Sequence, residues 1–136
     1  MRGGAFGGGI GYPAVMSFSP ELVALLDGSI EVDIETRSAA GTPHRATIWV
    51  VVDRTDVFVR SVNGTRGRWY REAIADPAVA LHLDGRRLPA RATPAADEGS
   101  IDRASRGYEQ KYRGDPSTPA MLQPEILDTT IRLEPA

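Results

Sequence analysis

The sequence contains no cysteine, and this absence excludes several kinds of chemistry at once. A chain without cysteine forms no disulfide bonds, no thiolate zinc sites and no iron–sulfur clusters, and it has no cysteine nucleophile. Only two histidines are present, His44 and His82, so a metal site would need acidic side chains to complete it. We therefore expect no bound metal. The lack of cysteine also fits a cytoplasmic protein, which is the location we expect.

The chain also lacks a long hydrophobic segment and a strong excess of charge of one sign. Its longest apolar run, IWVVV at residues 48–52, is far shorter than the ~20 residues that a membrane span needs. The formal net charge is −2, and Lys111 is the only lysine. Proteins that bind DNA or RNA backbones usually carry a strongly positive balance. We therefore expect a small-molecule substrate as partner, with neither a membrane nor a nucleic acid.

The composition, 41% hydrophobic and 25% charged in 136 residues, is typical of one globular domain. Residues 1–15 are unusual because they hold six of the 14 glycines. Within them, GIGYPA at 9–14 matches the dinucleotide-binding pattern G-x-G-x-x-G/A, but no strand precedes it and Pro13 interrupts the helix that this pattern requires. We expect residues 1–15 to form a flexible extension and residues 16–136 to form the folded domain.

The order of helix and strand signals predicts a mainly antiparallel α+β fold. Ser19, Pro20 and Glu21 have the features of a helix start, and Gly28 those of a helix end. Residues 45–52 are apolar on both faces, which predicts a strand covered on each side. The most economical arrangement is a small closed barrel with helices at its ends. The predicted strands are 30–37, 45–52, 57–61, 79–84, 87–93 and 129–135, and the later predicted helices are 67–75 and 98–113.

The segment RSVNGTRGRWYRE, residues 60–72, concentrates arginine, glycine and a Trp-Tyr pair. Its latter half is explained by a helix, because at helical spacing Trp69 and Tyr70 fall on one side. Arg71 and Glu72 fall on the other side. This half therefore predicts an amphipathic helix with an aromatic core face and a charged solvent face.

The first half of the same segment predicts a site for one compact anion. A polar loop runs here from a strand end into a helix N-terminus, where free backbone N–H groups and the helix dipole favour an anion. The dipole contributes only ~0.3–1 kcal/mol, whereas a charge-assisted hydrogen bond from arginine adds roughly 1.5–3 kcal/mol. We expect Arg60, Arg66 and Arg68 to converge on that point. Converging donors suit a phosphate monoester better than an extended nucleic-acid backbone.

Several motifs together resemble the flavin-binding split-barrel superfamily, which includes pyridoxamine-phosphate-oxidase-like and deazaflavin-dependent nitroreductase-like proteins. The pattern IWVV, then VRS-x-x-G-x-x-G-x-WYR and YEQKY at 108–112, resembles a bacterial subfamily of unknown function within it. The resemblance covers roughly residues 16–135. It implies a six-stranded antiparallel split β-barrel with flanking helices.

The resemblance also implies a cofactor, either FMN or an 8-hydroxy-5-deazaflavin coenzyme. In the FMN branch a Ser-Arg-Lys loop before the helix holds the cofactor phosphate, and Thr65, Arg66 and Arg68 occupy similar positions. In the deazaflavin branch a Gly-Arg-Lys-Ser-Gly turn lies between the first two strands, and TRSAAG at 36–41 resembles it. The lysine is missing from both places in this sequence. The candidate cofactor-binding residues are Arg60, Ser61, Asn63, Thr65, Arg66, Gly67, Arg68, Trp69, Tyr70, Trp49, Arg37 and Ser38.

The implied activity is that of a flavin- or deazaflavin-dependent oxidoreductase that transfers a hydride to or from a small organic substrate. We assign no catalytic acid or base, because the cofactor carries the chemistry while the protein holds the phosphate, orients the ring and excludes water. The resemblance implies a homodimer with the cofactor between subunits. The alternative, favoured by the missing lysines, is a cofactor-free small-molecule binding protein or a non-redox enzyme that uses the same cleft. Haem binding through His44 or His82 is a third hypothesis.

Overall fold

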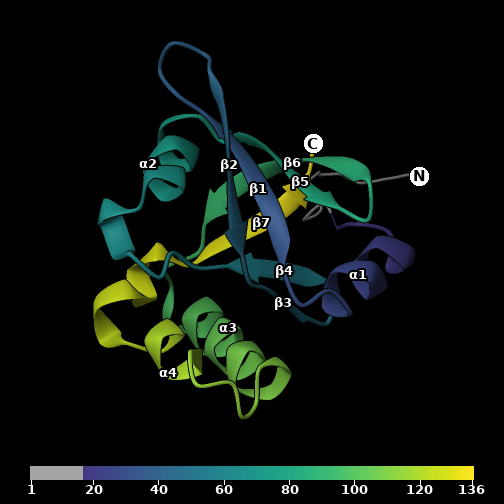
Figure 1. Cartoon of the computed structure of the whole chain (residues 1–136). Coiled ribbons are helices and arrows are strands. Elements are labelled where there is room, and N and C mark those ends of the chain that lie inside the picture. The colour runs from purple at the N-terminus through teal and green to yellow at the C-terminus, as the bar shows by residue number, and fades with distance from the viewer. Residues whose placement is uncertain (1–16) are drawn as a thin grey trace, which may run out of the picture.

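The computed structural model of the chain describes residues 17–136, and the glycine-rich extension that we expect lies outside them. Helices and strands follow one another in the predicted order, with short additional turns near the C-terminus (Figure 1). No helix in the described part of the chain has the length and apolar character needed to cross a bilayer. The helices are α1 (Pro20–Asp27), α2 (Arg68–Ala75), α3 (Glu98–Lys111) and α4 (Thr118–Met121), with 3-10 turns η1 (Gly64–Arg66) and η2 (Pro124–Thr129). The strands are β1 (Val32–Arg37), β2 (Pro43–Ile48), β3 (Val50–Asp53), β4 (Asp56–Val59), β5 (Ala78–Leu83), β6 (Arg86–Pro94) and β7 (Ile131–Pro135).

All seven strands form one antiparallel sheet, in the order β2-β1-β5-β6-β7-β4-β3. The two edge strands, β2 and β3, are consecutive in the chain. The sheet therefore curls until its two edges meet, and the backbone passes from one edge to the other through Trp49 (Figure 1). This arrangement is a split barrel of the predicted α+β class.

The structure corrects the strand count, because the single strand predicted over 45–52 is two strands. Residues up to Ile48 pair with β1, whereas those from Val50 onward pair with β4. Trp49 lies between them, and its ring stacks on Tyr112 with centroids 3.8 Å apart. The segment is apolar on both faces because it crosses between two parts of the sheet. A periodicity argument reads such a crossing as one continuous strand, which explains the prediction of six strands.

Two groups of buried side chains hold the fold together. The barrel interior is filled by alternate residues of the strands, such as Val32 and Ile34 of β1, and Phe18 and Leu26 cover it from the α1 end. A second cluster lies between α3 and the β3–β4 hairpin, where Tyr108 is fully buried. Ala104, Tyr108 and Tyr112 contribute to this cluster, so the outer face of β3 is covered by a helix. In Figure 1, α3 and α4 lie together below the sheet, and α2 lies beside the β1–β2 hairpin.

A charged cluster crosses three strands on the outer face of the sheet. The Glu35 carboxylate accepts hydrogen bonds from His82 Nε2 at 2.7 Å and from Arg87 Nη2 at 3.1 Å and Nε at 3.2 Å. Hydrogen bonds from Arg87 and then from His82 lower the pKa of Glu35 to about 2. Because β1, β5 and β6 each contribute one member, the cluster ties together neighbouring strands at the centre of the sheet.

We predict that Glu35 stabilises the fold above pH 4.5 and that this contribution is lost as the pH falls toward 2. The sign follows because the folded state holds the carboxylate below its usual pKa, so the unfolded chain takes up the proton first. Glu35→Gln should lower the free energy of unfolding by about 1 kcal/mol at pH 7, and by less at pH 3. Urea unfolding at both pH values measures this difference.

Glu109→Gln is the matched control for that measurement. Glu109 is exposed on α3 and makes no ion pair within residues 17–136. Its substitution should change the free energy of unfolding by the same small amount at both pH values. A Glu35→Gln effect that is equally independent of pH would contradict the assignment of the lowered pKa to this cluster.

Candidate functional site

Arg60, the first arginine of the predicted anion site, is buried in the fold. It follows β4 directly, and only 2% of its surface is exposed. Its guanidinium donates four hydrogen bonds, all to neutral oxygens. The acceptors are Thr130 Oγ1 at 2.9 Å, Ser105 Oγ at 3.1 Å, Met121 O at 2.9 Å and Ile101 O at 3.2 Å. Arg60 thereby links the end of β4 to α3, α4 and the residue before β7.

The positive charge of Arg60 has no carboxylate partner in the described part of the chain. Its guanidinium carbon lies 5.4 Å from the centroid of the Tyr108 ring, which is a favourable cation–π arrangement. Burial lowers the pKa of Arg60, and burial raises the pKa of Tyr108. Hydrogen bonds satisfy this buried charge, but no negative charge neutralises it.

The loop after Arg60 has its shape set by Ser61 and two glycines. Ser61 Oγ donates to Gly64 O at 2.8 Å, and Ser61 N donates to Thr129 Oγ1 at 3.1 Å. Gly64 has a φ of +64°, a conformation that favours glycine. A Cβ atom on Gly67 would lie 2.6 Å from Ser61 Oγ, so only glycine fits there without a shift. Ser61 and Gly67 therefore build the loop that leads into α2.

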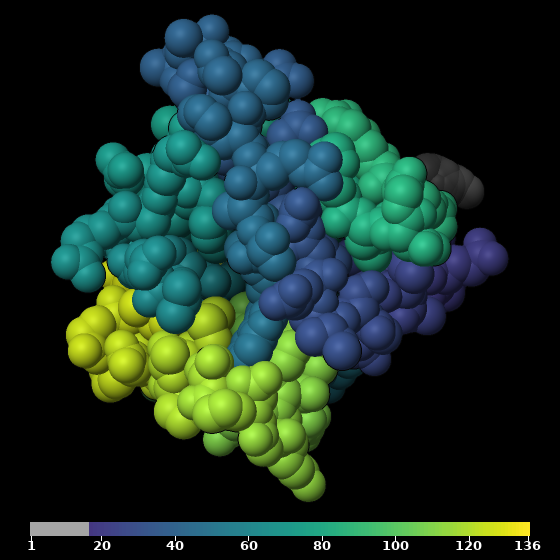
Figure 2. All heavy atoms as spheres, viewed as in Figure 1, coloured from purple at the N-terminus to yellow at the C-terminus, as the bar shows by residue number. Residues whose placement is uncertain are grey.

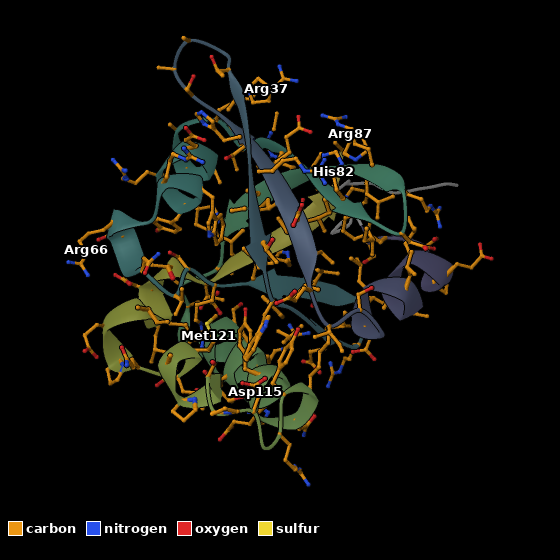
Figure 3. The ribbon with its side chains drawn as sticks, in the orientation of Figure 1. Arg37, Arg66, His82, Arg87, Asp115 and Met121 are labelled. Carbon is orange, nitrogen blue, oxygen red and sulfur yellow. The ribbon has the colours of Figure 1, made fainter. Side chains whose placement is uncertain are left out.

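The expected convergence of Arg60, Arg66 and Arg68 is not what the structure shows. Arg66 is exposed at the outer end of the loop, well separated from Arg37 in Figure 3. Two cavities, described below, lie next to α2. Neither Arg66 nor the exposed Thr65 beside it lines either of them. The reason is tertiary: residues 64–66 form the 3-10 turn η1, which packs against η2. The twelve candidate residues are distributed over two cavities, the loop framework and the core.

The first cavity, the central cleft, has a volume of about 820 Å³ and is bounded by four parts of the chain. These are the end of β2, the loop after β4, the start of α2 and the segment that includes α4. Figure 2 shows the surface hollowed between the yellow-green residues near α4 and the blue and teal residues of β2 and α2. Its lining residues are Ile30, Glu31, Ala46, Thr47, Ile48, Trp49, Arg60, Val62, Asn63, Trp69, Asp115, Pro116, Ser117, Ala120 and Met121.

Both tryptophans of the chain line the central cleft, and both are half-buried. The Trp49 ring stacks on the Tyr112 ring, and the Tyr112 hydroxyl donates a hydrogen bond to Ile30 O at 2.7 Å. Burial raises the pKa of Tyr112 to about 12. Trp69 meets Tyr70 edge-to-face with ring centroids 6.3 Å apart, and Tyr70 packs against the barrel core. The cleft therefore offers large aromatic surfaces held in place by neighbouring rings.

The second cavity, the arginine pocket, lies between α2 and the β1–β2 hairpin and measures about 570 Å³. Arg37 and Ser38 come from the hairpin, whereas Arg68 and Arg71 come from the helix. None of these three arginines forms an ion pair within residues 17–136. Helical spacing alone predicts a solvent-facing position for Arg71. Only the position of the hairpin, which sequence reasoning does not supply, places it in a cavity.

Glu72 also lines the arginine pocket, but its carboxylate is engaged toward the barrel. It accepts hydrogen bonds from Thr36 Oγ1 at 2.8 Å and from His44 Nδ1 at 2.9 Å. Burial raises the pKa of Glu72, but the hydrogen bonds from Thr36 and His44, together with the charges of His44 and Arg68, outweigh burial, so its pKa lies below the usual value. Glu72 is therefore hydrogen-bonded to other donors, and the exposed Asp76 is a second carboxylate that lines the pocket.

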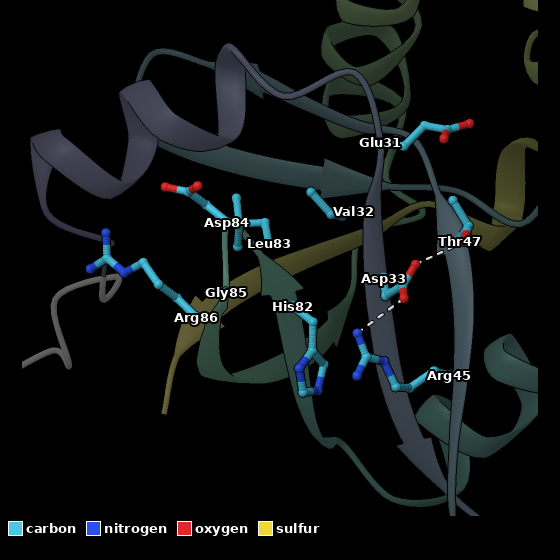
Figure 4. A pocket seen from close by; sticks show the side chains of 10 residues that line it. All are labelled: Glu31, Val32, Asp33, Arg45, Thr47, His82, Leu83, Asp84, Gly85 and Arg86. Carbon is cyan, nitrogen blue, oxygen red and sulfur yellow. Dashed lines mark hydrogen bonds and ion pairs between the residues drawn. The ribbon is translucent and has the colours of Figure 1, made fainter.

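A third cavity, the outer-face pocket, contains none of the candidate residues. It measures about 520 Å³, and His82 and Arg45 lie along it (Figure 4). Asp33 accepts hydrogen bonds from Arg45 Nη2 at 3.1 Å and from Thr47 Oγ1 at 2.8 Å. Because its lining residues carry charges of both signs, with Glu31, Asp33 and Asp84 beside Arg45 and Arg86, this pocket suits an anionic ligand less well than the arginine pocket. No group of three potential metal ligands lies together anywhere in residues 17–136.

Comparison with solved structures shows which fold this arrangement represents. HutZ, the heme storage protein from Vibrio cholerae, is 15% identical, with 89% of this chain and 92% of that chain covered and a TM-score of 0.61. A putative pyridoxamine 5'-phosphate oxidase from Listeria innocua is 15% identical, with 85% and 90% covered and a TM-score of 0.61. An F420-H2 dependent reductase, FDR-A, is 14% identical, with 77% and 94% covered and a TM-score of 0.58. Identities this low show the fold alone.

The sequence itself matches one family over most of its length. The profile of a family described as an uncharacterized protein conserved in bacteria (DUF2255) matches residues 23–133. A search of curated proteins found no match. The matched range includes the central cleft, the arginine pocket and the strands between them. The chain therefore belongs to the DUF2255 family of bacterial proteins and has the split-barrel fold of the flavin-binding superfamily.

Proposed function

We propose that this protein binds a phosphate-bearing flavin-type cofactor, FMN or a deazaflavin, and uses it as an oxidoreductase on a small organic substrate. The observation that carries the proposal is the position of two consecutive residues at the start of α2. Arg68 lines the arginine pocket, and Trp69 lines the central cleft. One short helix segment therefore borders both a cationic pocket and an aromatic cleft, the two kinds of surface that a flavin phosphate and a flavin ring require.

The arginine pocket fits a phosphate by its chemistry. Three guanidinium groups without ion-pair partners among residues 17–136 approach it from two elements, and Ser38 adds a hydroxyl. Arginine forms bidentate, charge-assisted hydrogen bonds with phosphate oxygens, each typically stronger than a hydrogen bond between neutral groups. The first turn of α2 adds free backbone N–H groups with no acidic residue among them. In this proposal Arg71 replaces Arg66 as a phosphate ligand.

The central cleft fits a ring system by its shape and lining. Its volume of about 820 Å³ lies within the range of about 300–1,000 Å³ of small-molecule sites. Trp49 and Trp69 supply aromatic walls, and Asn63 supplies an amide that can hydrogen-bond a ring heteroatom. A bound flavin or deazaflavin would supply the hydride chemistry. The protein would orient the ring, exclude water around it and hold the substrate beside it.

The structural neighbours support this proposal at the level of the fold. Two of them are named as an F420-H2 dependent reductase and a putative pyridoxamine 5'-phosphate oxidase. A third is named as a heme storage protein. For haem, the supporting observation here is His44, whose Nδ1 is oriented by Glu72 and whose Nε2 makes no hydrogen bond within residues 17–136. Haem therefore belongs among the ligands to be titrated.

The second candidate function is a cofactor-free binding protein or a non-redox enzyme that uses the same cleft. The observation that favours it is the position of Lys111, the only lysine. Its ammonium group donates to Val50 O at 2.6 Å and to Leu26 O at 3.1 Å, and it lines neither cavity. Burial lowers the pKa of Lys111 to about 8. No lysine therefore reinforces either the phosphate pocket or the cleft.

We also propose that the protein is a homodimer whose interface includes the rim of the central cleft. Ile30 and Val62 line this rim with 75% and 51% of their surfaces exposed, and a second copy would cover them. Light scattering should give twice the chain mass of 14.7 kDa. Val62→Glu should shift the mass toward the monomer, because it places a charge in the covered surface. A wild-type protein that scatters as a monomer would remove this proposal.

Direct titration tests the proposed cofactor. FMN, a deazaflavin coenzyme and hemin are added separately to the purified full chain, and cofactor fluorescence or the hemin absorption band is followed. We expect FMN or the deazaflavin to bind with a dissociation constant of about ten micromolar or less, corresponding to roughly 7 kcal/mol. If only hemin binds, the redox proposal gives way to haem binding. If none of the three binds, the cofactor-free function stands instead.

Arg68→Ala tests the arginine pocket as the phosphate site. The substitution removes a charge-assisted hydrogen bond and should weaken cofactor binding by about 1–3 kcal/mol, roughly 5- to 150-fold. Arg66→Ala is the matched control, because Arg66 lies two residues away, is equally exposed and lines neither cavity. Its dissociation constant should stay within about twofold of the wild type. Equal losses in both variants would place the phosphate in the loop rather than in the pocket.

A further inference from the structure

The most unusual residue that borders the central cleft is the buried, charged Arg60. It lines a cavity of about 820 Å³ although only 2% of its surface is exposed, so it belongs to the inner wall of the cleft. A guanidinium has five N–H groups, and Arg60 makes four hydrogen bonds within residues 17–136. One N–H group of Arg60 therefore has no hydrogen-bond partner among the described residues.

The charge of Arg60 acts on the cleft with little screening. No carboxylate of the described residues pairs with it, and a buried charge without a counter-ion is costly unless a partner of opposite sign binds nearby. Glu31 and Asp115 also line the cleft, but both are exposed, so water and salt screen them. The inner wall is therefore positive, and the rim is weakly negative.

The remaining walls define the rest of the ligand. Trp49 and Trp69 offer aromatic faces, and Ala46, Ile48 and Met121 add apolar surface. A planar ring is favoured against such walls, because stacking and apolar burial both stabilise it. We propose that the central cleft binds planar aromatic carboxylates, with the ring between the tryptophan side chains and the carboxylate toward Arg60. This inference names a ligand class for the cleft that the proposed function also assigns to the flavin ring, so it is tested on protein without added cofactor.

The four hydrogen bonds of Arg60 inside the fold show a structural role, but they do not explain its charge. Elsewhere in the chain, neutral hydroxyl groups donate hydrogen bonds to backbone carbonyl oxygens. Tyr112 Oη donates to Ile30 O, and Thr118 Oγ1 donates to Tyr112 O. A permanently charged arginine at the wall of the largest described cavity adds an electrostatic preference that a neutral donor lacks. The sign of that preference is what the experiment measures.

A charge series of otherwise similar ligands tests this inference. Benzoate, benzamide and benzamidine have the same ring and nearly the same size, with charges of −1, 0 and +1. They are titrated into the full chain without added cofactor, and tryptophan fluorescence is followed, because the only two tryptophans both line the cleft. Benzoate should bind about tenfold more tightly than benzamide, and benzamidine should bind most weakly. Equal binding of all three, tightest binding of benzamidine, or no binding would overturn the inference.

Two variants assign the preference to Arg60. In Arg66→Ala, which changes a residue that borders neither cavity, benzoate should keep its advantage. In Arg60→Gln, checked for folding by its thermal unfolding, the advantage of benzoate over benzamide should disappear. If Arg60→Gln does not fold, the series in Arg68→Ala decides, because a preference that is lost there belongs to the other pocket. Cofactor binding is measured separately, so failure of the flavin proposal leaves this result unaffected, and the converse also holds.

Discussion

The barrel depends on one covalent constraint: the two edges of its sheet, β2 and β3, are consecutive strands joined through Trp49. An edge strand normally presents unpaired backbone groups, and here the chain itself brings the two edges together. The crossing point is held by the Trp49–Tyr112 stack and by the hydrogen bond from Tyr112 to Ile30. Because the crossing residue also lines the central cleft, the closure of the barrel and the largest cavity next to α2 share one side chain.

A second constraint sets the lower wall of the cleft. Arg60 donates hydrogen bonds to α3, α4 and the residue before β7, so it fixes the C-terminal part of the chain against the end of β4. Figure 3 shows Asp115 and Met121 together on this side of the molecule, far from Arg37. The segment around α4 thereby becomes a wall of the cleft. Its position follows from a buried arginine rather than from any pattern of its own.

The arginines show how one residue type takes different roles according to its surroundings. Arg60 is enclosed and holds the fold together, whereas Arg66 is exposed and borders neither cavity. Arg68 and Arg71 meet Arg37 across the arginine pocket, although more than 30 residues separate them in the chain. Within residues 17–136 these three form no ion pairs, and Glu72 of the same helix accepts hydrogen bonds from Thr36 and His44. The function that we propose depends on the three arginines that line the pocket and not on the exposed Arg66.

Much of the fold could be predicted from the sequence, because its signals are local. The helix start at Ser19 and the helix end at Gly28 each depend on residues close in the chain, and the structure confirms them. The superfamily could be inferred from motifs with fixed spacing. The break at Trp49 could not, because a crossing between two edges has the same apolar pattern as a strand with both faces covered.

The candidate site was predicted less well, because a cavity depends on contacts between distant segments. The sequence by itself determined which residues carry charge and aromatic surface, since composition and helical spacing are properties of the chain alone. Only the tertiary structure decided that Arg60 is buried, that Arg71 borders a pocket with Arg37, and that the segment around α4 completes the cleft. The physical reason is that burial and convergence arise from packing of the sheet and helices, which no local pattern encodes.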